Sequence, residues 1–204
     1  MPRKSPKTLP FCDRTPSNRL NPARAIARAR ITTLLWGEDA LCFRYGFYMS
    51  LPPILQVLVP DNEVENAAAV VLRMPGSIKL TELPDDFGED HWRDPMRSSA
   101  HTKSALVKLP VLVPDLLVPQ LVAIHPFSDF HFSINDSTAR PYSTPNLHFP
   151  TPIAFTNCMI DTYLDPTSGV FHHRVRRSWV IWLHDLVEGL AGGYHHLPNG
   201  QLHP

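Results

Sequence analysis

The chain has 204 residues, of which 43% are hydrophobic and 19% are charged. That length suits one domain of ordinary size, and the composition is not that of a disordered protein. No apolar run approaches the ~20 residues that cross a bilayer, so we expect no membrane partner. The three cysteines are odd in number and widely spaced, which argues against a secreted disulfide framework and a zinc finger; they are Cys12, Cys42 and Cys158.

Positive charge is concentrated at the start of the chain. The first 30 residues hold eight Lys or Arg and one acid, Asp13, a net charge of +7, and residues 31–204 therefore carry −7. Residues 1–20 are also rich in proline and predict a basic arm that is disordered to about Asn18. Such an arm could bind nucleic acid or an acidic partner, or be a mitochondrial presequence; a solvated tail is the simpler interpretation. We expect a cytoplasmic protein, with the nucleus or mitochondrion as alternatives.

The first predicted elements follow this arm. Asn21 and Pro22 predict a helix start, because Asn caps helices and Pro suits the first helical position. The β-branched and apolar run Ile31–Trp36 predicts a short buried strand that ends at Gly37. A short helix is expected over Glu38–Tyr45, with two acids in its favourable first turn.

The clearest strand–turn–helix unit comes next. Ile54–Val59 is almost continuously apolar, as in a central strand that is covered on both faces, and Pro60 ends it. Asn62 with Glu65 three residues later predicts a capping box. Apolar residues at helical spacing then predict one buried helix face.

The rest of the chain completes an α/β or α+β pattern, with a mixed sheet of about four to five strands and flanking helices. We expect one domain over 21–192, including C-terminal helices, and a tail over 193–204. The later elements are a surface loop at 82–104, strands at Leu106–Val113 and Leu121–His125, and helices at Ile153–Leu164 and Phe171–Leu190. The last helix carries an apolar stripe with Trp179 and Trp182, interpreted as a core face that could extend into a patch for a protein partner.

Two segments carry a resemblance to a known group. One is Leu35–Val71, with LeuTrpGlyGluAspAla, ValLeuValProAsp and GluAsnAlaAlaAla, and the other runs from PheProThrProIleAla to the Trp-rich terminal helix. They resemble uncharacterised fungal proteins whose shared core is a nucleotidyltransferase-like α/β unit. The resemblance implies a Gly-containing turn that holds phosphates and, on the next strand, two acids that hold divalent metal.

The acids that the resemblance implies are missing. Gly37 occupies the expected turn and is the candidate ligand-binding residue, but the next strand carries Ile54 and Gln56 where acids are expected. Glu38 and Asp39 also place negative charge at the helix start, where a phosphate would lie. The prediction is therefore a degenerate, non-catalytic domain that acts in binding or interaction, without a cofactor or metal.

Two enzymatic alternatives remain open. One is a Mg²⁺-dependent nucleotidyl- or phosphotransferase with a rearranged site, for which the candidate catalytic residues are Glu38, Asp39 and Asp61. The simpler interpretation of these acids, and of Glu63 and Glu65, is that they are helix-start residues that accept backbone hydrogen bonds. The other alternative is an accessory enzyme of unknown reaction that uses Asp129 and His131, meeting on one strand.

The other histidines and the cysteines predict no site. His173 and His184 share a helix face but lie roughly 16 Å apart at 1.5 Å per residue. His184 and Glu188 could chelate only weakly, and the adjacent pairs His172-His173 and His195-His196 lack zinc spacing. Cys42 and Cys158 are interpreted as core thiols, and the chain has no phosphate-binding or dinucleotide-binding glycine motif.

Overall fold

The computed structural model describes residues 19–45, 54–81, 103–110, 119–135, 137–142 and 144–165. Most of the loop expected at 82–104, the helix expected at Phe171–Leu190 and the tail lie outside these residues. In chain order the elements are α1 Asn21–Arg28, β1 Thr33–Trp36, α2 Gly37–Tyr45, β2 Ile54–Val59, η1 Asp61–Glu63, α3 Val64–Leu72, β3 Ile78–Leu80, β4 Ala105–Lys108, β5 Leu121–Pro126, η3 Phe127–Phe130, β6 Ala139–Pro141, β7 Leu147–Pro150 and α5 Pro152–Leu164.

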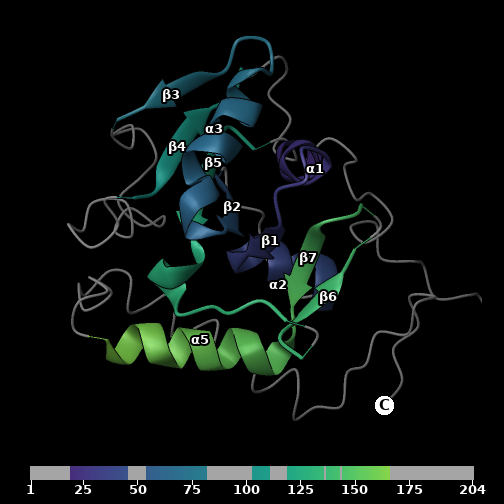
Figure 1. The fold of residues 1–204 in the computed structure, drawn as a ribbon, viewed down its shortest axis with the longest axis vertical. Helices are drawn as coiled ribbons and strands as arrows, with labels where there is room; N and C mark the ends of the chain where they lie inside the picture. Colours follow the sequence, from purple (N-terminus) through teal and green to yellow (C-terminus); the bar gives the residue numbers. More distant parts are fainter. Residues whose placement is uncertain are drawn as a thin grey trace, which may run out of the picture.

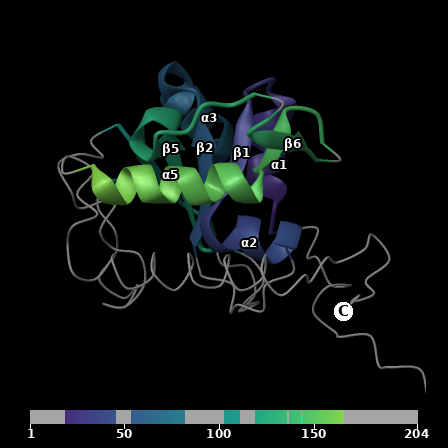
Figure 2. The ribbon, with the colours of Figure 1, turned by 90° about the horizontal axis from the view of Figure 1, so that it is seen from below.

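The described strands form one seven-stranded mixed sheet in the order β3-β4-β5-β2-β1-β7-β6 (Figure 1). At its centre β2 runs parallel to β5, while β1 is antiparallel to β2 and β4 is antiparallel to β5. Helices flank the sheet, and in Figure 2 α3 and α2 lie on opposite sides of the central strands. The expected α/β class with a mixed sheet and flanking helices is confirmed.

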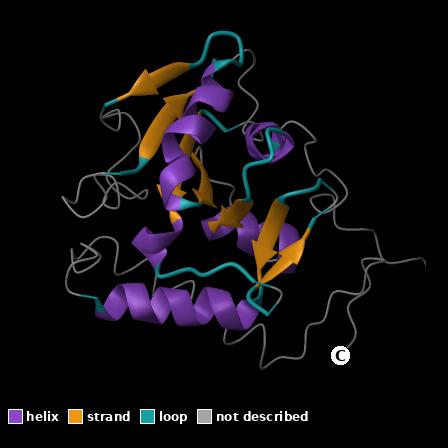
Figure 3. Cartoon of the chain, in the orientation of Figure 1, coloured by secondary structure: helices purple, strands orange, loops and turns teal. Residues whose placement is uncertain are grey.

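The sheet has more strands than the four to five expected. The additional ones are β3 and β6, with three residues each, and β7, with four. β3 and β6 form the two edges of the sheet (Figure 3). A strand of three or four residues shows too little alternation for its period to be recognised, and β3 is mostly exposed.

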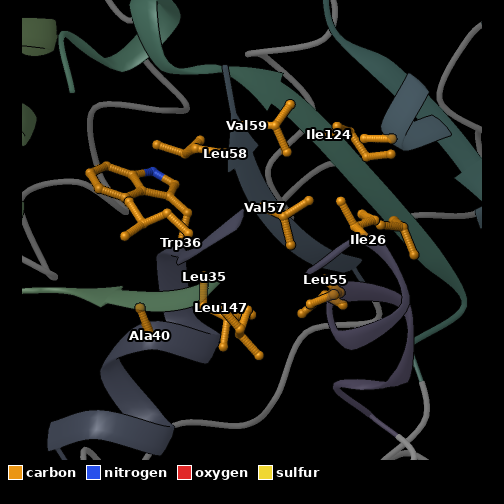
Figure 4. Packing of buried hydrophobic residues seen from close by; sticks show 14 of the residues in the cluster. Ile26, Leu35, Trp36, Ala40, Leu55, Val57, Leu58, Val59, Ile124 and Leu147 are labelled. Carbon is orange, nitrogen blue, oxygen red and sulfur yellow. The ribbon is translucent and has the colours of Figure 1, made fainter. Parts of the chain in front are cut away.

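β2 is the buried central strand that its apolar run predicts, since all six of its residues are buried. Leu55 and Val57 point toward Ile26 of α1 and Ile124 of β5, and Leu58 lies beside Trp36 on the other face (Figure 4). Fully burying one such aliphatic side chain stabilises the fold by about 1.5–3 kcal/mol. β2 is therefore held in place from both faces.

The start of α3 differs from the sequence prediction. The prediction of a capping box from Asn62 and Glu65 is wrong, because the 3₁₀ turn Asp61–Glu63 comes first and α3 begins only at Val64. No side chain caps α3. Glu65 instead accepts a hydrogen bond from Lys79 Nζ at 2.6 Å.

α5 is capped at its N-terminus. Thr151 at its N-cap accepts a hydrogen bond from the Ala154 backbone N–H at 3.3 Å, and Pro152 is the first helical residue. Pro at this position loses no helical hydrogen bond. The helix expected at Ile153–Leu164 is confirmed, beginning one residue earlier.

The folded domain starts before residue 21. Arg19 and Leu20, which the sequence assigns to the end of the basic arm, are both fully buried. Leu20 belongs to the hydrophobic core, and its carbonyl accepts from the Arg24 backbone N–H at 2.8 Å.

Every helix within the described ranges is too short or too polar to cross a bilayer.

Candidate functional site

The turn between β1 and α2 lies where the resemblance implies a phosphate-holding turn. Gly37 is the first residue of α2 and has φ 65°, in the left-handed region that glycine adopts without strain. Glu38 beside it is half-buried. The local geometry therefore explains why glycine stands at this position.

β2 lies directly beside this turn, as its register with β1 shows. Trp36, the residue before Gly37, pairs with Gln56, and Leu35 pairs with Val57. Ile54 and Gln56 are only 4% and 7% exposed. The strand that faces the turn thus carries one neutral amide and no carboxylate.

Asp39 in the first turn of α2 forms a buried ion pair with Arg19. Arg19 Nε donates to Asp39 Oδ1 at 2.5 Å and Arg19 Nη2 donates to Asp39 Oδ2 at 2.8 Å. The two side chains are 0% and 1% exposed. This bidentate geometry engages both carboxylate oxygens and fixes Arg19, two residues before α1, against α2.

Burial is the largest influence on the acidity of Asp39. It raises the pKa of the Asp39 carboxyl above its ordinary value, against the opposing hydrogen bond and charge of Arg19. Removal from water disfavours the charged form, and the guanidinium favours it. A carboxylate in this position serves the fold, because both of its oxygens are already bound to Arg19.

Asp61 lies at the opposite end of β2 from Glu38 and Asp39. Because β1 is antiparallel to β2, Trp36 is level with Gln56, whereas Asp61 follows Val59. Three strand residues from Gln56 to Val59 cover roughly 10 Å. A metal ion needs its oxygen ligands within about 2.6 Å, so these acids do not share one ion.

The acids around η1 have partners of their own. Asp61 Oδ1 accepts from the Ser128 backbone N–H at 3.2 Å, and Glu63 Oε2 accepts from Asn66 Nδ2 at 2.8 Å. These bonds differ from the caps on their own helix that the sequence suggests. Across the described part of the chain, no three His, Cys, Asp or Glu side chains are placed to hold one metal ion.

Asp129 and His131 do not meet on a strand. Asp129 belongs to η3, and His131 follows it with φ 51°, which turns the chain. His131 Nε2 lies 3.0 Å from Asp165 Oδ2 at the end of α5. Asp129 instead accepts a hydrogen bond from Ser104 Oγ at 3.1 Å.

Ser104 is a polar residue that the sequence did not single out. Its Oγ also lies 2.8 Å from Nδ1 of His125, which is 21 residues away in the chain. The side chain of His125 is 1% exposed. No local pattern predicts such a contact, and only the pairing of β4 with β5 brings these residues together.

Cys158 is a core thiol, as its apolar helical context suggests. It is 7% exposed, and its Sγ donates to the His131 carbonyl at 3.6 Å. Burial, followed by the nearby charge of Asp161, raises the pKa of the Cys158 thiol to about 12. The thiol is therefore protonated at neutral pH and is a poor nucleophile. The side chain of Cys42, all of Cys12, and His172, His173, His184, His195, His196, Glu188, Trp179 and Trp182 lie outside the described residues.

Known proteins offer little similarity to this chain. No protein-family model matches the chain, and no curated protein matches it. Among solved structures, the solution structure of the antibiotic-resistance factor ANT(2'')-Ia is similar at 13% identity, over 86% of this chain and 92% of that chain, with a TM-score of 0.41. That degree of likeness is too low to assign a fold family. The account of this chain therefore depends on its own α/β sheet and on the residues at the two ends of β2.

Proposed function

We propose that this chain is a nucleotidyltransferase-like domain that has lost catalysis and acts in binding or interaction. The observation that carries the proposal is Gln56, which stands on the buried strand β2 beside the Gly37 turn. An amide at this position offers no negative charge to a metal ion. The domain keeps a turn suited to a close backbone approach but lacks acids on the strand beside it.

The chemistry of nucleotidyl transfer explains why this loss matters. The transferred group carries several negative charges, which enzymes neutralise with metal ions bridging carboxylates and phosphate oxygens. The six residues of β2, IleLeuGlnValLeuVal, are all uncharged and buried. The nearby carboxylate of Asp39 is already bound to Arg19 through both oxygens. Neither β2 nor Asp39 therefore supports a two-metal site.

The geometry argues against the alternative Mg²⁺-dependent transferase. Its proposed ligands Glu38 and Asp39 follow β1 at one end of β2, and Asp61 follows the other end. If Glu38 alone bound a cation, the protein would supply only one carboxylate ligand close to the turn. The activity lost in this proposal is nucleotidyl transfer.

A thermal-shift titration tests the proposal. The full chain is heated with Mg²⁺ or Mn²⁺ and each nucleoside triphosphate at millimolar concentration. A working site filled at 100 times its Kd would add about 2.7 kcal/mol of stability. For a protein of this size that corresponds to a rise in Tm of roughly 5–10 °C. We expect no such rise.

Two variants identify the source of any rise that does occur. A rise in Tm that disappears in Glu38→Ala would contradict the proposal, because it would place a metal–nucleotide site at the turn. A rise that needs both the metal and the nucleotide, is lost in Asp61→Ala and is kept in Glu38→Ala would place a metal–nucleotide site at the opposite end of β2, and would also contradict the loss of nucleotidyl transfer. We also propose partners for two segments of the chain. The basic arm would bind nucleic acid or an acidic partner, and the apolar stripe with Trp179 and Trp182 would bind a protein.

A further inference from the structure

Three polar side chains from separate parts of the chain meet where β5 ends. β4 lies beside β5 in the sheet (Figure 1). The two strands are antiparallel, with Ala105 paired to Ile124, so Ser104 comes beside His125. Asp129 follows in η3, which begins directly after β5. This is the carboxyl end of the parallel pair β2 and β5, the edge at which ligands bind in open α/β sheets.

The hydrogen-bond directions in this group follow from its chemistry. Ser104 Oγ lies 3.1 Å from Asp129 Oδ2 and 2.8 Å from His125 Nδ1. A carboxylate only accepts, so the single hydroxyl proton of Ser104 points to Asp129. With that proton used, the contact between Ser104 Oγ and His125 Nδ1 is a hydrogen bond in the tautomer that carries its proton on Nδ1. The serine oxygen therefore has a base on one side and a hydrogen-bond donor on the other.

Burial differs among the three residues. Ser104 and Asp129 are half-buried, whereas His125 is 1% exposed. The His125 ring stands edge-on to the Phe130 ring, with centroids 5.3 Å apart. Packing against Phe130 thus restrains the histidine ring, while the serine and the aspartate are only partly buried.

We propose that Ser104 is a nucleophile toward activated acyl groups such as esters, with Asp129 as its general base and His125 as a positioning residue. Both Ser104 contacts fall within the 2.6–3.2 Å expected of an activated nucleophile and its partners. This activity goes beyond the proposed binding function and does not depend on it, because the group lies at the other end of the sheet from Gly37.

The proposed step balances as an acyl transfer. Ser104 Oγ forms a bond to the ester carbonyl carbon as its proton passes to Asp129 Oδ2. The bond to the alcohol oxygen breaks, and the departing alcohol takes that proton from Asp129. Water then attacks the acyl-serine, giving its proton to Asp129, and the carboxylic acid leaves as the proton returns to Ser104.

Labelling with a fluorophosphonate probe tests the nucleophile on the full chain. Attack by Ser104 forms an O–P bond and releases fluoride with the hydroxyl proton as HF. We expect one label, mapped to Ser104 by mass spectrometry and absent in Ser104→Ala. In Asp129→Asn the labelling rate should fall by at least about 10²-fold, the lower range for loss of a general base. Asp129→Glu should restore part of the rate.

Ser128→Ala is the matched control, because Ser128 is an exposed serine in the same turn whose side chain is outside the group. Its labelling rate should equal that of the unchanged chain. The role of His125 is tested by the pH profile of labelling, which should shift in His125→Gln but would stay in place for a purely structural hydrogen bond. An unlabelled folded chain, a label that persists in Ser104→Ala, or an unchanged rate in folded Asp129→Asn would overturn the proposal.

Discussion

Replacing Arg19 by Met is expected to lower the free energy of unfolding by about 3–5 kcal/mol, measured by urea denaturation. The reason is that Asp39 is 1% exposed and has its two oxygens bound to Arg19. The substitution would leave a carboxylate buried without its cation. Such a loss is a large part of the 5–15 kcal/mol that holds a typical domain folded.

Two further variants separate the ion pair from side-chain packing. Arg19→Met with Asp39→Leu removes both charges and should recover most of the loss, since apolar residues often replace a buried pair at little cost. Lys79→Met is the matched control, because Lys79 forms an exposed ion pair with Glu65, with side chains 46% and 74% exposed. It should cost less than about 1 kcal/mol. Equal losses for Arg19→Met and Lys79→Met would contradict the account of the Arg19–Asp39 pair.

Trp36→Ala is expected to destabilise the fold by about 3–5 kcal/mol, the range for removing a large aromatic side chain from a core. Trp36 is 1% exposed, and its ring lies 4.4 Å from the Phe155 ring and 5.2 Å from the Phe130 ring, centroid to centroid. These contacts join β1 to α5 and η3, so the cavity would open between three elements. Urea denaturation followed by far-UV circular dichroism measures the loss.

A conservative variant and a surface variant serve as controls for Trp36. Trp36→Phe should cost clearly less than Trp36→Ala, because it keeps a ring against Phe155 and removes an indole Nε1 that has no hydrogen-bond partner in the described structure. Ile153→Ala removes an apolar side chain that is 72% exposed on α5. It should change stability by no more than about 0.5 kcal/mol. A loss in Ile153→Ala as large as in Trp36→Ala would show that the aromatic cluster is not central to the core.

The strongest local patterns in the sequence predicted their elements well. β2 was predictable because six consecutive residues are suited to burial, and the start of α2 because Gly37 separates an apolar run from two acids. The helix α5 was predicted to within one residue of its start. In each case the deciding interactions lie within a few residues, which is the range over which a sequence pattern is informative.

The pairings that define the two ends of β2 were not predictable in the same way. Arg19 was assigned to a basic arm, because nothing in the neighbouring sequence indicates that its guanidinium forms an ion pair with Asp39, 20 residues later. Ser104 and His125 are 21 residues apart and meet only through the β4–β5 pairing. The sequence itself shows that β2 carries no acid. The distance between Asp61 and Glu38 could be inferred only from the strand register.

The most direct measurement is the paramagnetic effect of Mn²⁺, added with a non-hydrolysable nucleoside triphosphate, on backbone amide signals of the full chain. A bound Mn²⁺ ion broadens signals of nearby amides, so it locates a metal site by residue. If β2 lacks a metal-binding centre, the signals of Gly37 and Gln56 keep their intensity at substoichiometric Mn²⁺. Selective loss of those two signals, reversed by Mg²⁺, would show a working metal–nucleotide site and contradict the account.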